Sequence, residues 1–103
     1  MSRGPDAATV LRRVIERAAR AAGCDIVLGE MRTTRWASAT FVGARHGVTL
    51  SVADDAAAAA WLGGLAEAEL PMRGHLVADL NLVATRRGAG RAEVEIEALT
   101  VEV

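Results

Sequence analysis

The stretch LVADLNLV at residues 76–83 has an apolar side chain at every even position and a mixture at the odd positions. The stretch AEVEIEA at residues 92–98 repeats this alternation, with glutamate at its three odd positions. Successive side chains of a β-strand point to opposite faces, so each stretch predicts a strand with one buried face. The segment RRGAG at residues 86–90 is typical of a turn, so the two strands are expected to form a hairpin.

The final hairpin is expected to join residues 75–85 to residues 91–103. Its second strand has one irregularity, because the apolar positions change from even to odd after Ala98, to Leu99, Val101 and Val103. A single extra residue on one strand of a pair produces such a change, so this pattern predicts a β-bulge after Ala98.

The first part of the chain predicts a helix over residues 6–22. Asp6 is a suitable N-cap, and Gly23 stands where a C-terminal glycine is common. Apolar residues recur at helical spacing and arginines occupy the opposite side. The apolar stripe consists of Leu11, Val14, Ile15, Ala18 and Ala22.

Three short strands are predicted next, over residues 24–31, 35–43 and 48–52. Turns at residues 31–34 and 43–47 would join them into an antiparallel meander, with Gly43 and Gly47 bounding the second turn. The first turn would place Leu28 opposite Ala37 and keep both apolar sets on one face.

A second helix is predicted over residues 54–69, capped by Asp54 and Asp55 and ended before Pro71. Glycine is unfavourable inside a helix, so Gly63 and Gly64 are expected to allow close contact with the alanines of the first helix.

Together these elements predict a single α+β domain over residues 1–103, in the order helix, three strands, helix, two strands. We expect a two-layer sandwich with both helices on one face of a mostly antiparallel five-stranded sheet. The predicted inward residues are Ile26, Leu28, Phe41, Leu50, Leu80, Leu82, Val94 and Ile96. The order of the first five elements resembles the double-stranded RNA-binding domain. Asp54 and Asp55 replace the basic residues that this family carries there, so nucleic-acid binding is not expected.

The composition predicts a globular domain and excludes several chemistries. Hydrophobic residues make up 51% of the 103 residues, and all 12 basic residues are arginine, a usage typical of a GC-rich bacterial genome. Without lysine, no Schiff base or P-loop lysine can form. Cys24 is the single cysteine, and no long apolar run is present. We therefore expect a cytoplasmic protein that does not enter a membrane, and no motif predicts a metal or cofactor.

Charge is distributed unevenly along the chain. Residues 1–45 hold eight arginines and four acids, whereas residues 46–103 hold four arginines and nine acids. In the predicted fold the N-termini of both helices meet two arginine-bearing turns at one end. Helix N-termini attract anions, so this end is a candidate site for a small anionic ligand or phosphate. Its residues would be Arg32, Arg35, Arg86, Arg87 and Arg91.

The opposite end of the predicted fold gathers Asp25, Arg45, His46, Arg73 and His75. Histidine titrates near neutral pH, so His46 and His75 are candidates for acid–base chemistry in a small enzyme. The two histidines are far apart in the sequence and match no metal-ligand spacing.

The outer face of the predicted sheet provides the leading functional hypothesis. An exposed tryptophan among β-branched residues is typical of a contact surface, so we expect a protein-interaction domain that forms a homodimer or binds another protein. The residues predicted at this interface are Val27, Trp36, Val42, Val77 and Val83.

Overall fold

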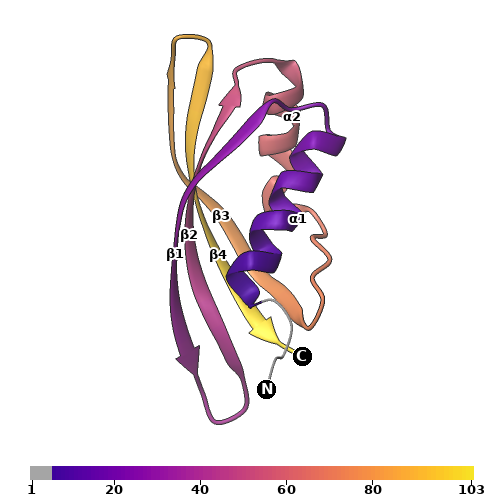
Figure 1. Cartoon of the computed structure of the whole chain (residues 1–103), viewed down its shortest axis with the longest axis vertical. Helices are drawn as coiled ribbons and strands as arrows, with labels where there is room; N and C mark the ends of the chain where they lie inside the picture. The colour runs from indigo at the N-terminus through magenta and orange to yellow at the C-terminus, as the bar shows by residue number, and fades with distance from the viewer. Residues whose placement is uncertain (1–5) are drawn as a thin grey trace.

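The computed structural model describes residues 6–103 as two α-helices packed on one antiparallel sheet (Figure 1). The elements are α1 (Ala7–Ala21), β1 (Ile26–Ala37), β2 (Val42–Ala53), α2 (Ala56–Gly64) with a 3-10 turn (Leu65–Glu67), β3 (His75–Gly88) and β4 (Arg91–Glu102). The strand order is β1-β2-β4-β3, so β1 and β3 are the edge strands. No helix in this part of the chain is both long and apolar enough to cross a membrane.

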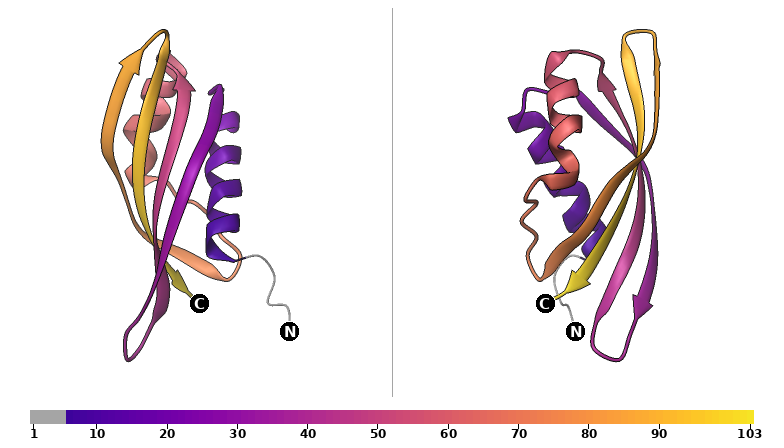
Figure 2. Two further views of the ribbon diagram at one scale, coloured as in Figure 1. Left: turned by 60° about the vertical axis from the view of Figure 1, so that its left-hand side comes forward. Right: turned by 180° about the vertical axis from the view of Figure 1, so that it is seen from behind.

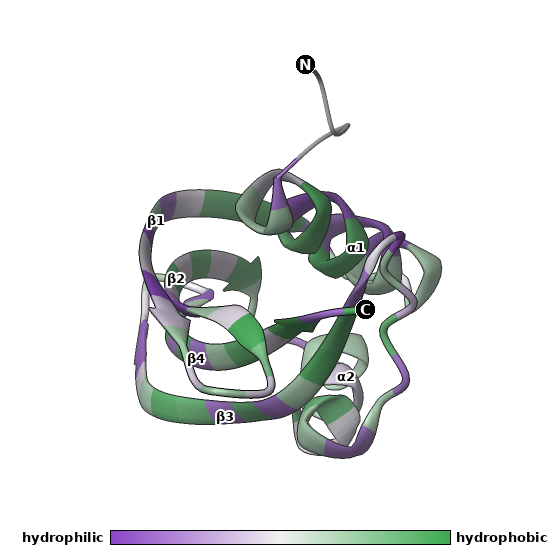
Figure 3. Cartoon of the chain, turned by 90° about the horizontal axis from the view of Figure 1, so that it is seen from below, coloured by the Kyte–Doolittle hydropathy of each residue, from purple (hydrophilic) through white to green (hydrophobic). Residues whose placement is uncertain are grey.

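Both helices lie on the same side of the sheet, which we call its inner face (Figures 1 and 3). The α+β class and the placement of both helices are therefore confirmed. The sheet has four long strands, however, and the prediction of five strands is wrong. The order of elements is αββαββ, so the likeness to the double-stranded RNA-binding domain, which depended on three strands between the helices, does not hold.

The predicted turn at residues 31–34 is replaced by a β-bulge within β1. The register of β1 against β2 shifts between Leu28 and Met31, after which Met31 lies opposite Val48 and Thr33 opposite His46. The bulge moves the inward side chains from even to odd positions. A turn produces the same change in the sequence pattern, so the pattern alone does not distinguish a turn from a bulge.

The hairpin between β1 and β2 turns at residues 38–41 instead of 43–47. The Ser38 hydroxyl oxygen accepts hydrogen bonds from the backbone N–H groups of Thr40 (3.3 Å) and Phe41 (3.0 Å). The Ser38 N–H donates to the Phe41 carbonyl over 2.8 Å, which closes the loop. Gly43 and Gly47 lie inside β2, where each pairs with one residue of β1 and one residue of β4.

The predicted hairpin of β3 and β4 is present, with a tighter turn. Ala89 and Gly90 form a two-residue loop, and both have positive φ angles, 55° and 75°. This geometry matches the right-handed twist of the flanking strands. The predicted bulge after Ala98 is wrong, because the register shifts lie in β3, between Val77 and Asp79 and again between Leu82 and Ala84. β4 alternates without interruption.

Both ends of α1 are capped as the sequence predicts. The Asp6 carboxylate accepts a hydrogen bond from the Thr9 N–H over 2.8 Å, and this bond holds the pKa of Asp6 below its usual value. Gly23 has a positive φ of 82°, and its N–H and that of Cys24 donate to the carbonyls of Arg20 and Ala19. These two bonds form a Schellman motif, which ends the helix.

α2 is shorter than predicted and is capped by Asp55, whose carboxylate accepts from the Ala58 N–H over 2.9 Å. Asp54 instead forms an ion pair with Arg87. The expected contact of Gly63 and Gly64 with α1 is wrong, because both glycines face open space. Leu65 and Leu70, which follow α2, are the buried anchors of this segment.

The core lies between the sheet and the helices. α1 contributes Leu11, Ile15 and Ala19, all fully buried. Of the eight predicted inward residues, Ile26, Leu50, Leu80, Val94 and Ile96 are buried, and Leu28 and Leu82 pack against them. Phe41 is the exception: it lies in the β1–β2 turn, 55% exposed.

The number of strands between the helices decides where each helix begins. Two antiparallel strands return the chain to the end of the sheet at which α1 finished. In Figures 1 and 2, α1 accordingly begins at the lower end and α2 at the upper end. The prediction that both N-termini meet at one end is therefore wrong, because it assumed three intervening strands.

The inward assignment can be tested by truncating one confirmed and one corrected core residue. Leu80→Ala should lower the free energy of unfolding by about 2–5 kcal/mol, because the side chain is only 3% exposed. Phe41→Ala should change it by less than about 1 kcal/mol, because surface truncations remove few contacts. Urea denaturation measures both values. Equal losses for the two variants would contradict this placement of the core.

Candidate interaction surface

The outer face of the sheet carries a row of apolar residues near the β1–β2 turn. Trp36 of β1 lies opposite Gly43 of β2, Gly43 lies opposite Val101 of β4, and Val101 lies opposite Leu76 of β3. Directly opposed residues of an antiparallel sheet share a face. We call Trp36, Leu76 and Val101, with Leu99 two residues along β4, the apolar row.

The Trp36 ring packs against Gly43. A β-carbon at Gly43 would stand 2.6 Å from Cζ2 of Trp36 and would also collide with the Thr100 carbonyl oxygen. Only glycine leaves room for this contact. The Trp36 indole nitrogen is buried and has no hydrogen-bond partner within residues 6–103. The ring is thus half-buried against its own sheet and exposes one side.

The rest of the apolar row is more open to solvent. Leu76 is 58% exposed, whereas Val101 and Leu99 are half-buried between neighbouring strands. Phe41 and Val42, at the adjacent hairpin turn, are also exposed. Side chains of this size at one end of a sheet form a surface suited to contact with another protein.

The predicted interface residues do not all belong to this surface. Trp36 lies in the apolar row. Val42 pairs with Ala37, one position from the outward Gly43, so it lies on the inner face, and its predicted place on the outer face is wrong. Val27 is exposed on the outer face at the other end of β1, and Val83 lies in a bulge of the edge strand β3. Val77 packs against the core. The β3 bulge turns Val77 inward and Leu76 outward, so Leu76 was missed in the sequence.

The five arginines predicted to bind an anion do not converge. Arg32 lies between Glu30 (3.9 Å) and Glu95 (3.8 Å) on the outer face. Arg87, beside the β3–β4 turn, pairs with Asp54 over 3.4 Å.

Arg91 is the most heavily bonded of the five. It donates to the Ser51 hydroxyl over 2.7 Å and approaches the Asp25 carboxylate at 3.3 Å. Its guanidinium also donates to the backbone carbonyls of Ser51 and Asp25. Arg91 therefore joins β4 to the start of β1. Arg86 lies on the outer face, opposite Glu93.

His46 is fully buried on the inner face, where it connects three strands. Its Nδ1 lies 3.0 Å from the Thr33 hydroxyl of β1, and its Nε2 lies 2.9 Å from the Thr100 hydroxyl of β4. The Thr100 hydroxyl donates to the Ala44 carbonyl, so it accepts from Nε2–H, and Nδ1 accepts from Thr33. Both ring nitrogens are thus engaged in structural hydrogen bonds.

Burial lowers the pKa of His46 below its usual 6.5, and the nearby His75 lowers it further, while Asp6 opposes the shift. The neutral imidazole is therefore favoured in the folded protein. The predicted grouping with Asp25 is wrong, because the Asp25 carboxylate lies beside Arg91 at the other end of the sheet.

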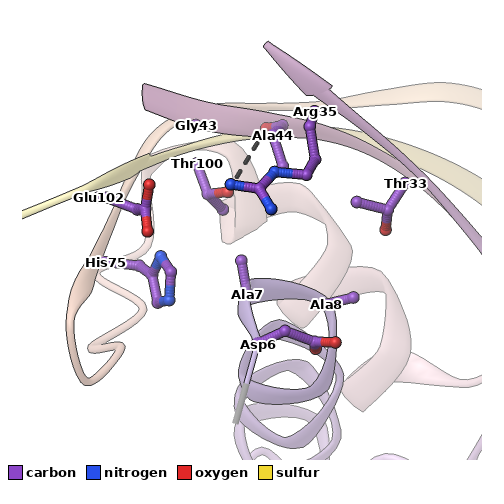
Figure 4. A pocket seen from close by; sticks show the side chains of 10 residues that line it. All are labelled: Asp6, Ala7, Ala8, Thr33, Arg35, Gly43, Ala44, His75, Thr100 and Glu102. Atoms are coloured by element: carbon purple, nitrogen blue, oxygen red, sulfur yellow. Dashed lines mark hydrogen bonds between the residues drawn. The ribbon is translucent and has the colours of Figure 1, made fainter. Parts of the chain in front are cut away.

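A pocket of about 350 Å³ opens beside the His46 network, between the start of α1 and the end of the sheet (Figure 4). The Arg35 guanidinium extends into it, next to Thr100 (Figure 4). Its lining also includes Asp6, Thr33, His75 and Glu102. Acidic and basic groups face the same space, so their opposite charges offset one another. Arg35 is the only one of the five predicted anion-binding arginines that lines this pocket.

Residues 6–103 contain no group of three or more histidine, cysteine, aspartate or glutamate side chains arranged to hold a metal ion. Cys24 is buried in the core, and burial raises the pKa of its thiol. A thiol in this state is a weak nucleophile.

Comparison with known proteins identifies the fold. No protein-family model and no curated protein matches the sequence. A solved chain described as "Virion of native gene transfer agent (GTA) particle" has a similar structure, with a TM-score of 0.54 and 23% sequence identity. The match covers 76% of this chain and 68% of that chain. At this identity the likeness shows a shared fold.

The contact between Trp36 and Gly43 provides a test with a matched control. Gly43→Ala should destabilise the protein by about 1–3 kcal/mol, because the new methyl group must displace the indole ring or the strand. Gly47→Ala should be neutral or slightly stabilising, since a β-carbon there meets nothing within 4 Å. Thermal unfolding monitored by circular dichroism compares the two. Equal tolerance of both substitutions would contradict the packing of Trp36.

The buried His46 predicts a loss of stability in mild acid. Below pH 6.5 the unfolded chain binds a proton that the folded imidazole resists, so stability falls as the pH falls towards the folded pKa. His46 contributes up to about 1.4 kcal/mol per pH unit to the slope of the free energy of unfolding against pH. Urea denaturation of the wild type and of His46→Gln between pH 7.5 and 5 measures it. The variant should lose this part of the slope, and identical slopes would contradict the assignment.

Proposed function

We propose that this chain is a protein-interaction domain that associates with copies of itself through the apolar row on the outer face of the sheet. The smallest assembly formed by this association is a homodimer. The observation that carries the proposal is the position of Trp36, Leu76 and Val101 in one row, on the face opposite the helices. We place this role in the bacterial cytoplasm, as the arginine usage and the single cysteine suggest.

The energetics of the apolar row favour association. Removing apolar surface from water contributes roughly 25 cal/mol per Å², and large side chains near the centre of an interface supply most of the binding free energy. Trp36 is held in place by its contact with Gly43, so little rotational freedom is lost when a partner covers it. The row is therefore organised for binding before the partner arrives.

The similar solved chain is consistent with such a role. Its description places it in a virion particle, and an assembled particle is a setting in which a small domain acts through contact with other protein chains. The similarity between the two chains is one of fold, so the proposal depends on the surface described above.

The proposal predicts that one charge in the apolar row weakens association. Leu76→Asp should lower the association constant by at least about tenfold, because a carboxylate would be buried without a partner. Ala60→Asp, on the exposed side of α2, is the matched control and should leave the constant unchanged. Sedimentation velocity from 1 to 200 µM measures both, with circular dichroism to verify folding. A wild-type chain that is monomeric throughout this range contradicts self-association.

A further inference from the structure

We propose that copies of this chain associate head to tail, with α1 of one copy against the outer sheet face of the next. This inference rests on the proposed self-association and specifies its geometry. It follows from two surfaces, a basic stripe on α1 and a column of glutamates on β4, which lie on opposite sides of the molecule.

The basic stripe consists of Arg13, Arg17 and Arg20. Their spacing of four and three residues places them on one side of the helix, opposite the buried Leu11 and Ile15. All three are exposed. Within residues 6–103, Arg13 and Arg17 form no ion pair, and Arg20 forms only an exposed pair with Glu16 of the same helix, over 3.5 Å. The stripe thus presents positive charge away from the sheet.

The glutamate column consists of Glu93, Glu95 and Glu97, which alternate along β4 on the outer face. Glu95 approaches Arg32 at 3.8 Å, whereas Glu93 and Glu97 form no ion pair within residues 6–103. Other charges lie on or beside this face, and the acids outnumber the arginines. The arginines are Arg32, Arg45, Arg86 and Arg91, and the further acids are Asp25, Glu30 and Asp79.

β4 carries charged and apolar side chains in one line on the outer face. Its outward residues are acidic from Glu93 to Glu97 and apolar at Leu99 and Val101. The outer side of α1 is also divided into a charged and an uncharged part, because the uncharged Thr9 and Val10 come before the arginines in the helix. The stripe from Arg13 to Arg20 spans about 10 Å at the helical rise. The column from Glu93 to Glu97 spans about 13 Å at the strand rise. A helix laid along β4 can therefore pair its arginines with the glutamates and cover Leu99 and Val101.

Symmetry distinguishes this contact from a twofold dimer. Two outer faces packed against each other would bring each glutamate column towards another acidic face, and like charges oppose such a contact. In the head-to-tail contact, unlike charges meet. Each copy then keeps one free basic stripe or one free acidic face, so further copies can add until a ring closes or a filament extends.

The test exchanges the charges of the two surfaces. R13E/R17E and E93R/E97R should each lower the wild-type association constant at least about tenfold, because repulsion replaces attraction. The variant with all four substitutions should regain association, and so should an equimolar mixture of the two double variants. E67R/E69R, which reverses two exposed glutamates after α2, is the matched control and should associate as the wild type does. Sedimentation velocity in 50 mM and 500 mM NaCl measures all of these.

The outcomes separate this inference from the proposal on which it rests. If the wild type is monomeric at every concentration, self-association itself is wrong, and the head-to-tail contact fails with it. If the wild type associates and R13E/R17E associates equally well, self-association stands and α1 is not part of the contact. Failure of the fourfold variant to recover, when circular dichroism shows it folded, also overturns the pairing of these two surfaces.

Discussion

The packing of Trp36 against Gly43 holds together the part of the β1–β2 hairpin that projects beyond the helices. Because Gly43 has no β-carbon, the indole packs against the backbone of the neighbouring strand close to the end of β1, which continues to Ala37. The length of this hairpin has consequences for the whole fold. With only two strands between the helices, α2 begins at the end of the sheet where α1 finishes. Arg87 and Arg91 therefore lie at one end of the sheet, and Arg35 lies at the other.

The inner face of the same hairpin is stabilised by a polar contact of a different kind. His46 is fully buried, and burying an imidazole costs free energy unless both ring nitrogens find hydrogen-bond partners. Thr33 and Thr100 supply those partners from the two strands that flank β2. Because hydrogen bonds depend on position more strictly than apolar contacts do, this network specifies the register of three strands at once. The neighbouring pocket shares Thr33 and Thr100 with it.

The two sides of the molecule differ in their chemistry, and the difference originates in how each is built. α1 must place Leu11, Ile15 and Ala19 on the sheet, so its arginines are left on the far side. β4 must place Val94 and Ile96 in the core, so its glutamates are left on the outer face. The same alternation that forms the core thus separates positive from negative charge. The head-to-tail contact proposed above would join these unlike faces, and it would repeat the same orientation from copy to copy.

Local patterns in the sequence determined α1 with its caps at Asp6 and Gly23, the hairpin of β3 and β4, and most of the buried residues of the sheet. These features depend on residues a few positions apart, which the sequence displays directly. Only the tertiary structure decided that β1 contains a bulge, that Gly43 accommodates Trp36, that Leu76 and Val101 share the outer face, and that the five arginines are apart. A turn and a bulge change the alternation in the same way, and a glycine serves a turn or a close contact equally well. The partner strand distinguishes them, because it supplies the hydrogen bonds and side chains that make one arrangement lower in free energy.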